Sequence, residues 1–286
     1  MSILFALLTF ITWAFGDIFG AIASRKTDGY STTFWVYIFG FIITSFYLPF
    51  SISAFKFLTW PIFFLTILLG FFQLAGNTMN NEAMKISNPS LIGTITGSTY
   101  SGSAVLFSAL IFKEHLSSFQ ILSLILIFIG VILTSINLQS IKKGLFWDKG
   151  IKLALLTMFS WTIFAVFIKS IVVKIGWFLP TYFALSLFPL LFIYMKFKKI
   201  PLQKPTLGNA MLPILLSSIF LRTGEFTFNL GLKQGSIPII SSIAGAYPAL
   251  FVLIAFFIFK QRINKQQITG ILTTLSGIIL LSIVSI

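Results

Sequence analysis

The chain has 286 residues, of which 57% are hydrophobic and only 9% are charged. A soluble protein carries about a quarter of charged residues, so this composition excludes a water-exposed globular surface and predicts a multi-pass membrane protein. The formal net charge of +14 comes from 20 Lys and Arg against 6 Asp and Glu. Basic residues flank the spans of membrane proteins and report their topology, so we infer no nucleic-acid partner from them.

The same composition argues against an enzyme. The absence of Cys excludes disulfides and thiolate chemistry, and one His with six acidic residues leaves few groups for acid–base catalysis. The sequence has no Gly-x-Ser-x-Gly element, no His pair and no paired intramembrane Asp motif. We therefore expect no catalytic residue, no metal site and no cofactor.

Intervals without charges predict ten transmembrane helices, because a helix in lipid satisfies its own backbone but tolerates few ionised side chains. The stretch 2–24 is apolar except for Asp17, and no basic segment precedes it, so we take it as the first helix and not as a signal peptide. Pro189 and Pro248 fall inside the seventh and ninth helices, where we expect each to cause a kink. The nine later intervals are 29–55, 57–81, 86–112, 116–141, 153–168, 175–195, 205–221 with its continuation to 232, 234–259 and 266–286.

An internal repeat divides the chain into two five-helix units, which we assign to residues 1–138 and 149–286. Because five is odd, the second unit must enter the membrane from the opposite side. The result is an inverted repeat, which many secondary transporters use to open one central site to each side in turn. The alternative is a duplication retained only for packing. Residues that recur at an offset of 148 include Ala6/Ala154, Thr9/Thr157, Trp13/Trp161, Lys26/Lys174, Thr33/Thr181, Asn81/Asn229, Lys85/Lys233 and Gly97/Gly245.

Small residues recur every four positions in the fourth helix and again in the ninth. Rows of small residues let helix backbones approach closely in lipid. Because the row occurs once in each half, we expect an internal contact near the pseudo-two-fold axis in preference to a dimer face, and either a monomer or a homodimer. The residues are Gly93, Gly97 and Ser101, with Ser241, Gly245 and Ala249 as their duplicates.

Polar side chains form one stripe on the third helix and a matching stripe on the eighth. Residues three or four apart share a helix face, and polar groups in a membrane usually face a protein interior or a wet cavity. We therefore predict that both stripes contribute to a solute-binding site. The members are Gln73, Asn77 and Asn81 on the third helix and Arg222, Glu225 and Asn229 on the eighth, with Asn77 the counterpart of Glu225.

The charged members allow two interpretations. Arg222 and Glu225 could form an ion pair that only neutralises two buried charges, and Asp17 could be an interfacial acid near Arg25 and Lys26. Our hypothesis is instead that Arg222 binds an anionic group of the solute and that Asp17 or Glu225 exchanges a proton. If Asp17 reaches the same cavity, the site is net negative and could accept a proton or a cationic group.

Four aromatic residues are candidate walls of that cavity, although aromatic residues at these depths often serve packing or the interface. They are Trp13 and Trp161, which are duplicates, and Tyr100 and Tyr247, which are nearly so.

These features together resemble the EamA-type transporters of the drug/metabolite transporter (DMT) superfamily. The resemblance rests on ten spans in two halves, a Trp in the first helix of each half, an Asn-rich third helix and a small-residue fourth helix. The chain differs where the family often has Gly-Glu-Arg, since it has Phe112-Lys113-Glu114-His115 and Phe259-Lys260-Gln261-Arg262.

The resemblance implies a transporter of a small polar metabolite, such as an amino acid, a sugar or a related solute, in a prokaryotic plasma membrane. The alternatives are a translocator of lipid-linked sugars and a structural or accessory subunit that transports nothing. Most basic loop residues follow the odd-numbered helices, which predicts that both termini lie outside the cytoplasm, whereas the resemblance implies that both lie inside.

Overall fold

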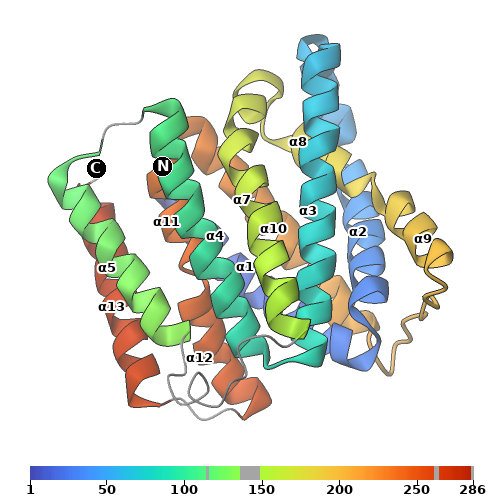
Figure 1. Cartoon of the computed structure of the whole chain (residues 1–286). Helices are drawn as coiled ribbons and strands as arrows, with labels where there is room; N and C mark the ends of the chain where they lie inside the picture. The colour runs from blue at the N-terminus through green and yellow to red at the C-terminus, as the bar shows by residue number, and fades with distance from the viewer. Residues whose placement is uncertain (114–115, 136–148, 261–263, 285–286) are drawn as a thin grey trace.

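The computed structural model describes residues 1–113, 116–135, 149–260 and 264–284, and these residues form helices without any strand (Figure 1). Glu114 and His115, the predicted repeat boundary at 138 and the basic residues of 142–148 lie outside the described residues. The helices of the first half are α1 (Ser2–Lys26), α2 (Gly29–Ser45), the 3₁₀ helix η1 (Leu48–Phe57), α3 (Trp60–Ile86), α4 (Pro89–Phe112) and α5 (Ser118–Ser135). Those of the second half are α7 (Lys149–Ile175), α8 (Phe178–Leu185), α9 (Phe188–Phe197), α10 (Met211–Gln234), α11 (Ile237–Gly245), α12 (Pro248–Phe259) and α13 (Lys265–Val284).

The helical membrane fold is confirmed, whereas the count of ten spans is not. Among the described residues, six helices are long and apolar enough to cross a membrane, and the number rises to seven if the bent pair of α2 and η1 is one span. Each predicted interval carries a helix or a helix pair. Some helices are too short or too polar to be counted in this way. They include α10, whose hydropathy is lowered by Arg222 and Glu225, and α5, whose described part is short.

The second predicted helix is shorter than its charge-free interval. We expected it to reach residue 55, but α2 ends at Ser45 and the chain then turns by 90° into η1. Pro49 explains the end, because it has no N–H to bond the carbonyl four residues earlier and it disfavours the helical conformation of the preceding residue.

At Pro189 and Pro248, where we predicted kinks, the structure has a short break in the helix of the span. The seventh span divides into α8 and α9, and the ninth into α11 and α12, with the proline in the first turn of the second segment. A missing N–H costs nothing in a first turn. The helix of the ninth span is therefore interrupted at residues 246 and 247, beside the site described below.

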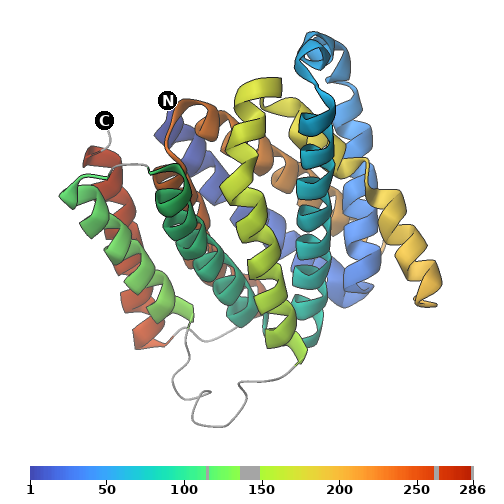
Figure 2. The same cartoon turned by 45° about the horizontal axis from the view of Figure 1, so that its top comes forward.

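The outer surface of the bundle is apolar, as contact with lipid requires. On α3, Phe64, Leu68 and Phe71 are between 49% and 64% exposed and share one face. The first residues of α1 and the last of α13 lie at the same end of the bundle in both views (Figures 1 and 2). At the opposite end, the loop at 26–28 lies against the chain before α10. There the Lys26 amino group donates to the Asn209 carbonyl oxygen at 2.9 Å. Which end faces the cytoplasm stays a prediction.

Helices of the two halves pack against each other in duplicated pairs. Helix α1 lies along α10, and their counterparts at the offset of 148, α7 and α3, lie along each other. The Thr9 hydroxyl donates to the carbonyl oxygen of Gly224 at 3.3 Å, and the duplicate Thr157 donates to that of Gly76, also at 3.3 Å. The most extensive helix–helix packing in the described residues therefore joins the two halves. The boundaries of the repeats themselves stay a prediction.

The small-residue rows of α4 and the ninth span meet inside the molecule. Helix α4 packs against α11 and α12, and a Cβ added at Gly97 would collide with the ring of Pro248 and lie 3.0 Å from Tyr247. The side chain of Ser101 is outside the described residues. The expected internal contact is thus present. The small residues allow α4 to pack closely against α11 and α12.

Candidate functional site between the two halves

A cavity of about 50 Å³ lies between the two halves, at the level of the break between α11 and α12. Helices α1, α3 and α4 contribute walls from the first half, and α7, α10 and Tyr247 contribute them from the second. A water needs about 10–15 Å³ when cavity volume is measured this way, so the space holds only a few waters. The lining residues are Trp13, Asp17, Gln73, Asn77, Tyr100, Trp161, Phe164, Leu221, Glu225 and Tyr247.

Eight of the eleven residues predicted for the site line this one cavity. The other three, Asn81, Arg222 and Asn229, are buried but do not line it. The eight are Trp13, Asp17, Gln73, Asn77, Tyr100, Trp161, Glu225 and Tyr247.

Asp17 is an interior residue and not an interfacial one. Its side chain on α1 is buried, and its Oδ2 accepts a hydrogen bond of 2.9 Å from the Tyr247 hydroxyl. The side chain of Asn80 on α3 lies next to this carboxyl group. No basic side chain lies within ion-pair distance of Asp17 among the described residues, so its carboxyl group is held by neutral partners alone.

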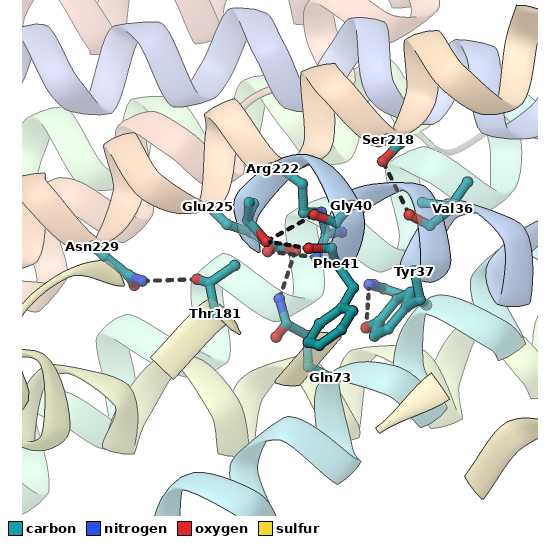
Figure 3. A network of polar contacts seen from close by, with 12 residues as sticks. Val36, Tyr37, Gly40, Phe41, Gln73, Thr181, Ser218, Arg222, Glu225 and Asn229 are labelled. Carbon is teal, nitrogen blue, oxygen red and sulfur yellow. Dashed lines mark hydrogen bonds and ion pairs between the residues drawn. The ribbon is translucent and has the colours of Figure 1, made fainter. Parts of the chain in front are cut away.

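Glu225 connects the cavity to the buried Arg222 (Figure 3). The Gln73 amide Nε2 donates to Glu225 Oε1 at 2.6 Å, and Arg222 Nη1 lies 2.7 Å from Glu225 Oε2. The ion pair of the simpler interpretation therefore exists, and one of its members also faces the cavity.

Arg222 lies behind Glu225, against α2. Its aliphatic stem fits over Gly40, where an added Cβ would lie 3.1 Å from Cδ, and its Cζ is 5.2 Å from the centre of the Tyr37 ring. Arg222 is 3% exposed, and its Nε and Nη2 have no hydrogen-bond partner among the described residues. Its positive charge is thus balanced by Glu225 and the ring of Tyr37, outside the cavity lining.

The amide of Asn77 is fixed at both ends. Its Nδ2 donates to the Tyr37 hydroxyl at 3.0 Å, and its Oδ1 accepts from Trp161 Nε1, also at 3.0 Å. Asn77 and Glu225 are duplicates, so the same position carries a neutral amide in one half and a carboxyl group in the other. The cavity is therefore chemically asymmetric across the pseudo-two-fold axis.

Asn81 and Asn229 have equivalent places outside the cavity. Asn81 Nδ2 donates to the Thr33 hydroxyl at 2.9 Å, and Asn229 Nδ2 donates to the Thr181 hydroxyl at 3.1 Å. These four residues are two duplicated pairs. Each bond joins two helices within one half, so the structure gives both asparagines a packing contact in which a buried amide donor is satisfied.

Aromatic rings form the remaining walls. Trp13 meets Tyr100 and Tyr247 with ring centres 6.3 and 6.1 Å apart, and Trp161 meets Tyr100 at 6.1 Å. The ring planes cross at 64°, 80° and 81° in these pairs. These are edge-to-face contacts, and all four rings line the cavity, so the two halves together build an aromatic box.

Each tryptophan is positioned by a glycine of the opposite half. A Cβ at Gly224 would collide with Trp13 Cδ1 and lie 2.7 Å from its Nε1, and a Cβ at Gly76 would lie 2.6 and 2.7 Å from the same two atoms of Trp161. The two glycines are duplicates, as are the two tryptophans. Close approach across the interface thus requires the absence of a side chain at both positions.

We expect Gly224→Ala to displace Trp13, lower the free energy of unfolding by about 1–3 kcal/mol and close the cavity. Adding Trp13→Phe should recover part of the lost stability, because the smaller ring leaves room for the methyl group. Thermal unfolding of the purified protein measures both effects. Gly208→Ala is the matched control, since a Cβ there meets nothing within 4 Å. Equal unfolding temperatures for the Gly224 and Gly208 variants would contradict this packing.

From the sequence we did not identify two apolar residues that line the cavity, nor an asparagine that lies beside it. Phe164 and Leu221 line the cavity but are ordinary apolar residues of apolar helices, and no pattern distinguishes them. Asn80 lies beside Asp17, and the Thr96 hydroxyl donates to Asn80 Oδ1 at 3.4 Å. The only available signal for Asn80 was its place beside Asn81 in the sequence. Adjacent residues of a helix lie on different faces, so Asn80 was not part of the polar stripe that contains Asn81.

The chain is similar over nearly its whole length to the family described as the "EamA-like transporter family", which matches residues 1–136 and 148–283. A solved structure described only as "Crystal structure of protein" has a TM-score of 0.77 at 15% sequence identity, with 99% of this chain and 96% of that chain covered. At that identity the likeness shows the fold alone. No curated protein matches the chain.

Proposed function

The chain belongs to the EamA-like transporter family and is a multi-pass membrane transporter of the DMT type, and from that premise we propose that it carries a small polar metabolite by alternating access. The solute is an amino acid, a sugar or a related compound, and the site is the cavity between the halves. The membrane we propose is a prokaryotic plasma membrane. The lipid-linked sugar translocator has no specific support, because the cavity described here is small and enclosed by side chains of both halves.

One observation supports this proposal above the others: the buried carboxyl and amide groups of both halves meet in a single cavity. Asp17, Gln73 and Glu225 are each 7% exposed or less and all line it. Burying such groups in a membrane protein is costly, and they commonly mark solute or ion pathways. A subunit that only packs against others has no need of them.

Alternating access follows from how the halves are joined. The α1–α10 and α3–α7 interfaces each cross from one half to the other, so rocking one half against the other would open the cavity towards one side and close it towards the other. The small volume of the cavity corresponds to a closed state in this scheme. In this scheme, the break between α11 and α12 beside Tyr247 is the point at which the ninth span would bend.

We propose that Asp17 carries the coupling proton. Glu225 is held by Arg222 and Gln73, whereas Asp17 is held by the hydroxyl of Tyr247 and lies beside the neutral Asn80. The other titratable groups that line this cavity are Tyr100, Tyr247 and Glu225, and Arg222 lies behind Glu225. A carboxyl group without a basic partner inside a membrane needs a proton or a cation to balance its charge.

Proteoliposomes with and without an imposed pH gradient test the proposal. Purified protein is reconstituted, and uptake is measured for a panel of labelled amino acids, sugars, amines and nucleosides. We expect saturable accumulation of at least one compound, increased by the gradient and abolished by a protonophore. Uptake no greater than in protein-free liposomes for every compound would contradict a transport function, and uptake that ignores the gradient would contradict proton coupling.

A further inference from the structure

The acidic and amide residues that line the cavity supply hydrogen-bond acceptors. Asp17 and Glu225 contribute carboxyl groups, and Gln73 contributes a carbonyl oxygen, Oε1, that is buried and has no partner among the described residues. The Gln73 nitrogen is already engaged, because it donates to Glu225 at 2.6 Å. An unpaired buried acceptor is costly, so a bound solute that donates N–H groups would complete the site.

No positive charge lines the cavity. The ten lining residues include no Lys, Arg or His, and the nearby Arg222 is placed behind Glu225, paired to it at 2.7 Å. Counting Asp17, Glu225 and Arg222 as ionised, the surroundings of the cavity carry one negative charge in excess. That excess resides at Asp17, which has no basic partner among the described residues.

The walls suit a cation as well. Two tryptophans and two tyrosines surround the space, with crossing ring planes in each contacting pair. The faces of aromatic rings attract cations, most strongly for Trp and where water is excluded. An anionic group in the same place would face two carboxyl groups and an amide oxygen, which repel it.

From these observations, and resting on the transport function proposed above, we propose that the transported solute is an organic ammonium ion. Its ammonium group binds between Asp17 and the free Oε1 of Gln73, and its carbon skeleton lies against the aromatic box. From the sequence we expected Arg222 to bind an anionic group of the solute. We give Arg222 no contact with the solute, because it does not line the cavity.

Three probes of similar size and different charge separate this proposal from its alternatives. They are n-butylammonium, 1-butanol and butyrate, and the measurement is the unfolding temperature of the purified full chain in detergent at neutral pH over a concentration series of each. A ligand that binds only the folded state raises this temperature in a saturable manner. We expect a saturable rise with butylammonium, and apparent affinities weaker by at least about tenfold for the other two probes.

Two variants test the assigned contacts. Asp17→Asn removes the charge while keeping an oxygen for the Tyr247 hydroxyl, and Trp13→Leu removes one wall; each should weaken butylammonium binding by about tenfold or more. Glu82→Gln is the matched control, because Glu82 accepts from the Gly29 amide at 3.0 Å outside the cavity. Its binding should equal that of the unmodified chain.

The possible failures are distinguishable. Preferential binding of butyrate or 1-butanol, lost in Asp17→Asn, would overturn the ammonium proposal and leave the cavity as the solute site. Stabilisation by none of the three, or butylammonium binding that both variants leave unchanged, would also overturn it. The transport function is judged separately by the uptake panel, so it can stand while the solute class is wrong.

Discussion

Asp17→Asn should abolish accumulation driven by a pH gradient while the protein remains folded. The substitution keeps the size of the side chain and an oxygen that can accept from Tyr247 at the present 2.9 Å, but an amide cannot gain or lose a proton at any accessible pH. Solute movement down its own gradient can persist, at the lower affinity expected without the Asp17 charge, whereas the coupling to protons cannot. The measurement is uptake into proteoliposomes with and without the imposed pH gradient, at matched protein content.

The control for this experiment is Glu82→Gln, which removes an acidic group of similar chemistry from a half-buried place outside the cavity. We expect it to accumulate solute as the unmodified chain does. If Asp17→Asn still concentrates solute in response to the gradient, Asp17 is not the proton carrier, and Glu225 becomes the remaining acidic group of the cavity for that role.

Much of this site could be predicted from spacing and duplication alone. Helical spacing placed Gln73 and Asn77 on one face, and the offset of 148 related Asn77 to Glu225 and Trp13 to Trp161. In a membrane protein this information goes far, because buried polar groups are few and their cost directs them inward. A duplicated pair also predicts two equivalent environments, which the Thr9–Gly224 and Thr157–Gly76 bonds confirm.

Spacing along the chain could not predict the contacts that depend on which helices are neighbours. Arg222 and Glu225 are three residues apart and so differ by about 60° around the helix axis, enough to turn Glu225 towards the cavity and Arg222 towards Gly40 of α2. The contribution of Tyr37, which bonds Asn77 and lies under Arg222, follows only from the packing of α2. The end of α2 at Ser45 was likewise hidden, because the absence of charge after it does not reveal the break caused by Pro49.

The buried ion pair of α10 gives the largest expected effect on stability. Arg222 and Glu225 are 3% and 5% exposed, and removing one partner of such a pair typically costs about 3–5 kcal/mol, because the other charge is left uncompensated. We therefore expect Arg222→Met to lower the unfolding temperature by on the order of 10 °C. The double variant Arg222→Met with Glu225→Gln should recover most of that loss, since no charge remains unpaired.

Transport by the double variant then separates the two interpretations of the pair. If the pair only neutralises two charges, a stable double variant should transport like the unmodified chain. Because Glu225 lines the cavity and is bonded by Gln73 at 2.6 Å, we expect uptake to fall by about tenfold or more even when stability is restored, as for the loss of a hydrogen bond to a charged group. Full uptake in a stable double variant would assign both residues to packing and leave Asp17 as the only charged residue of the site.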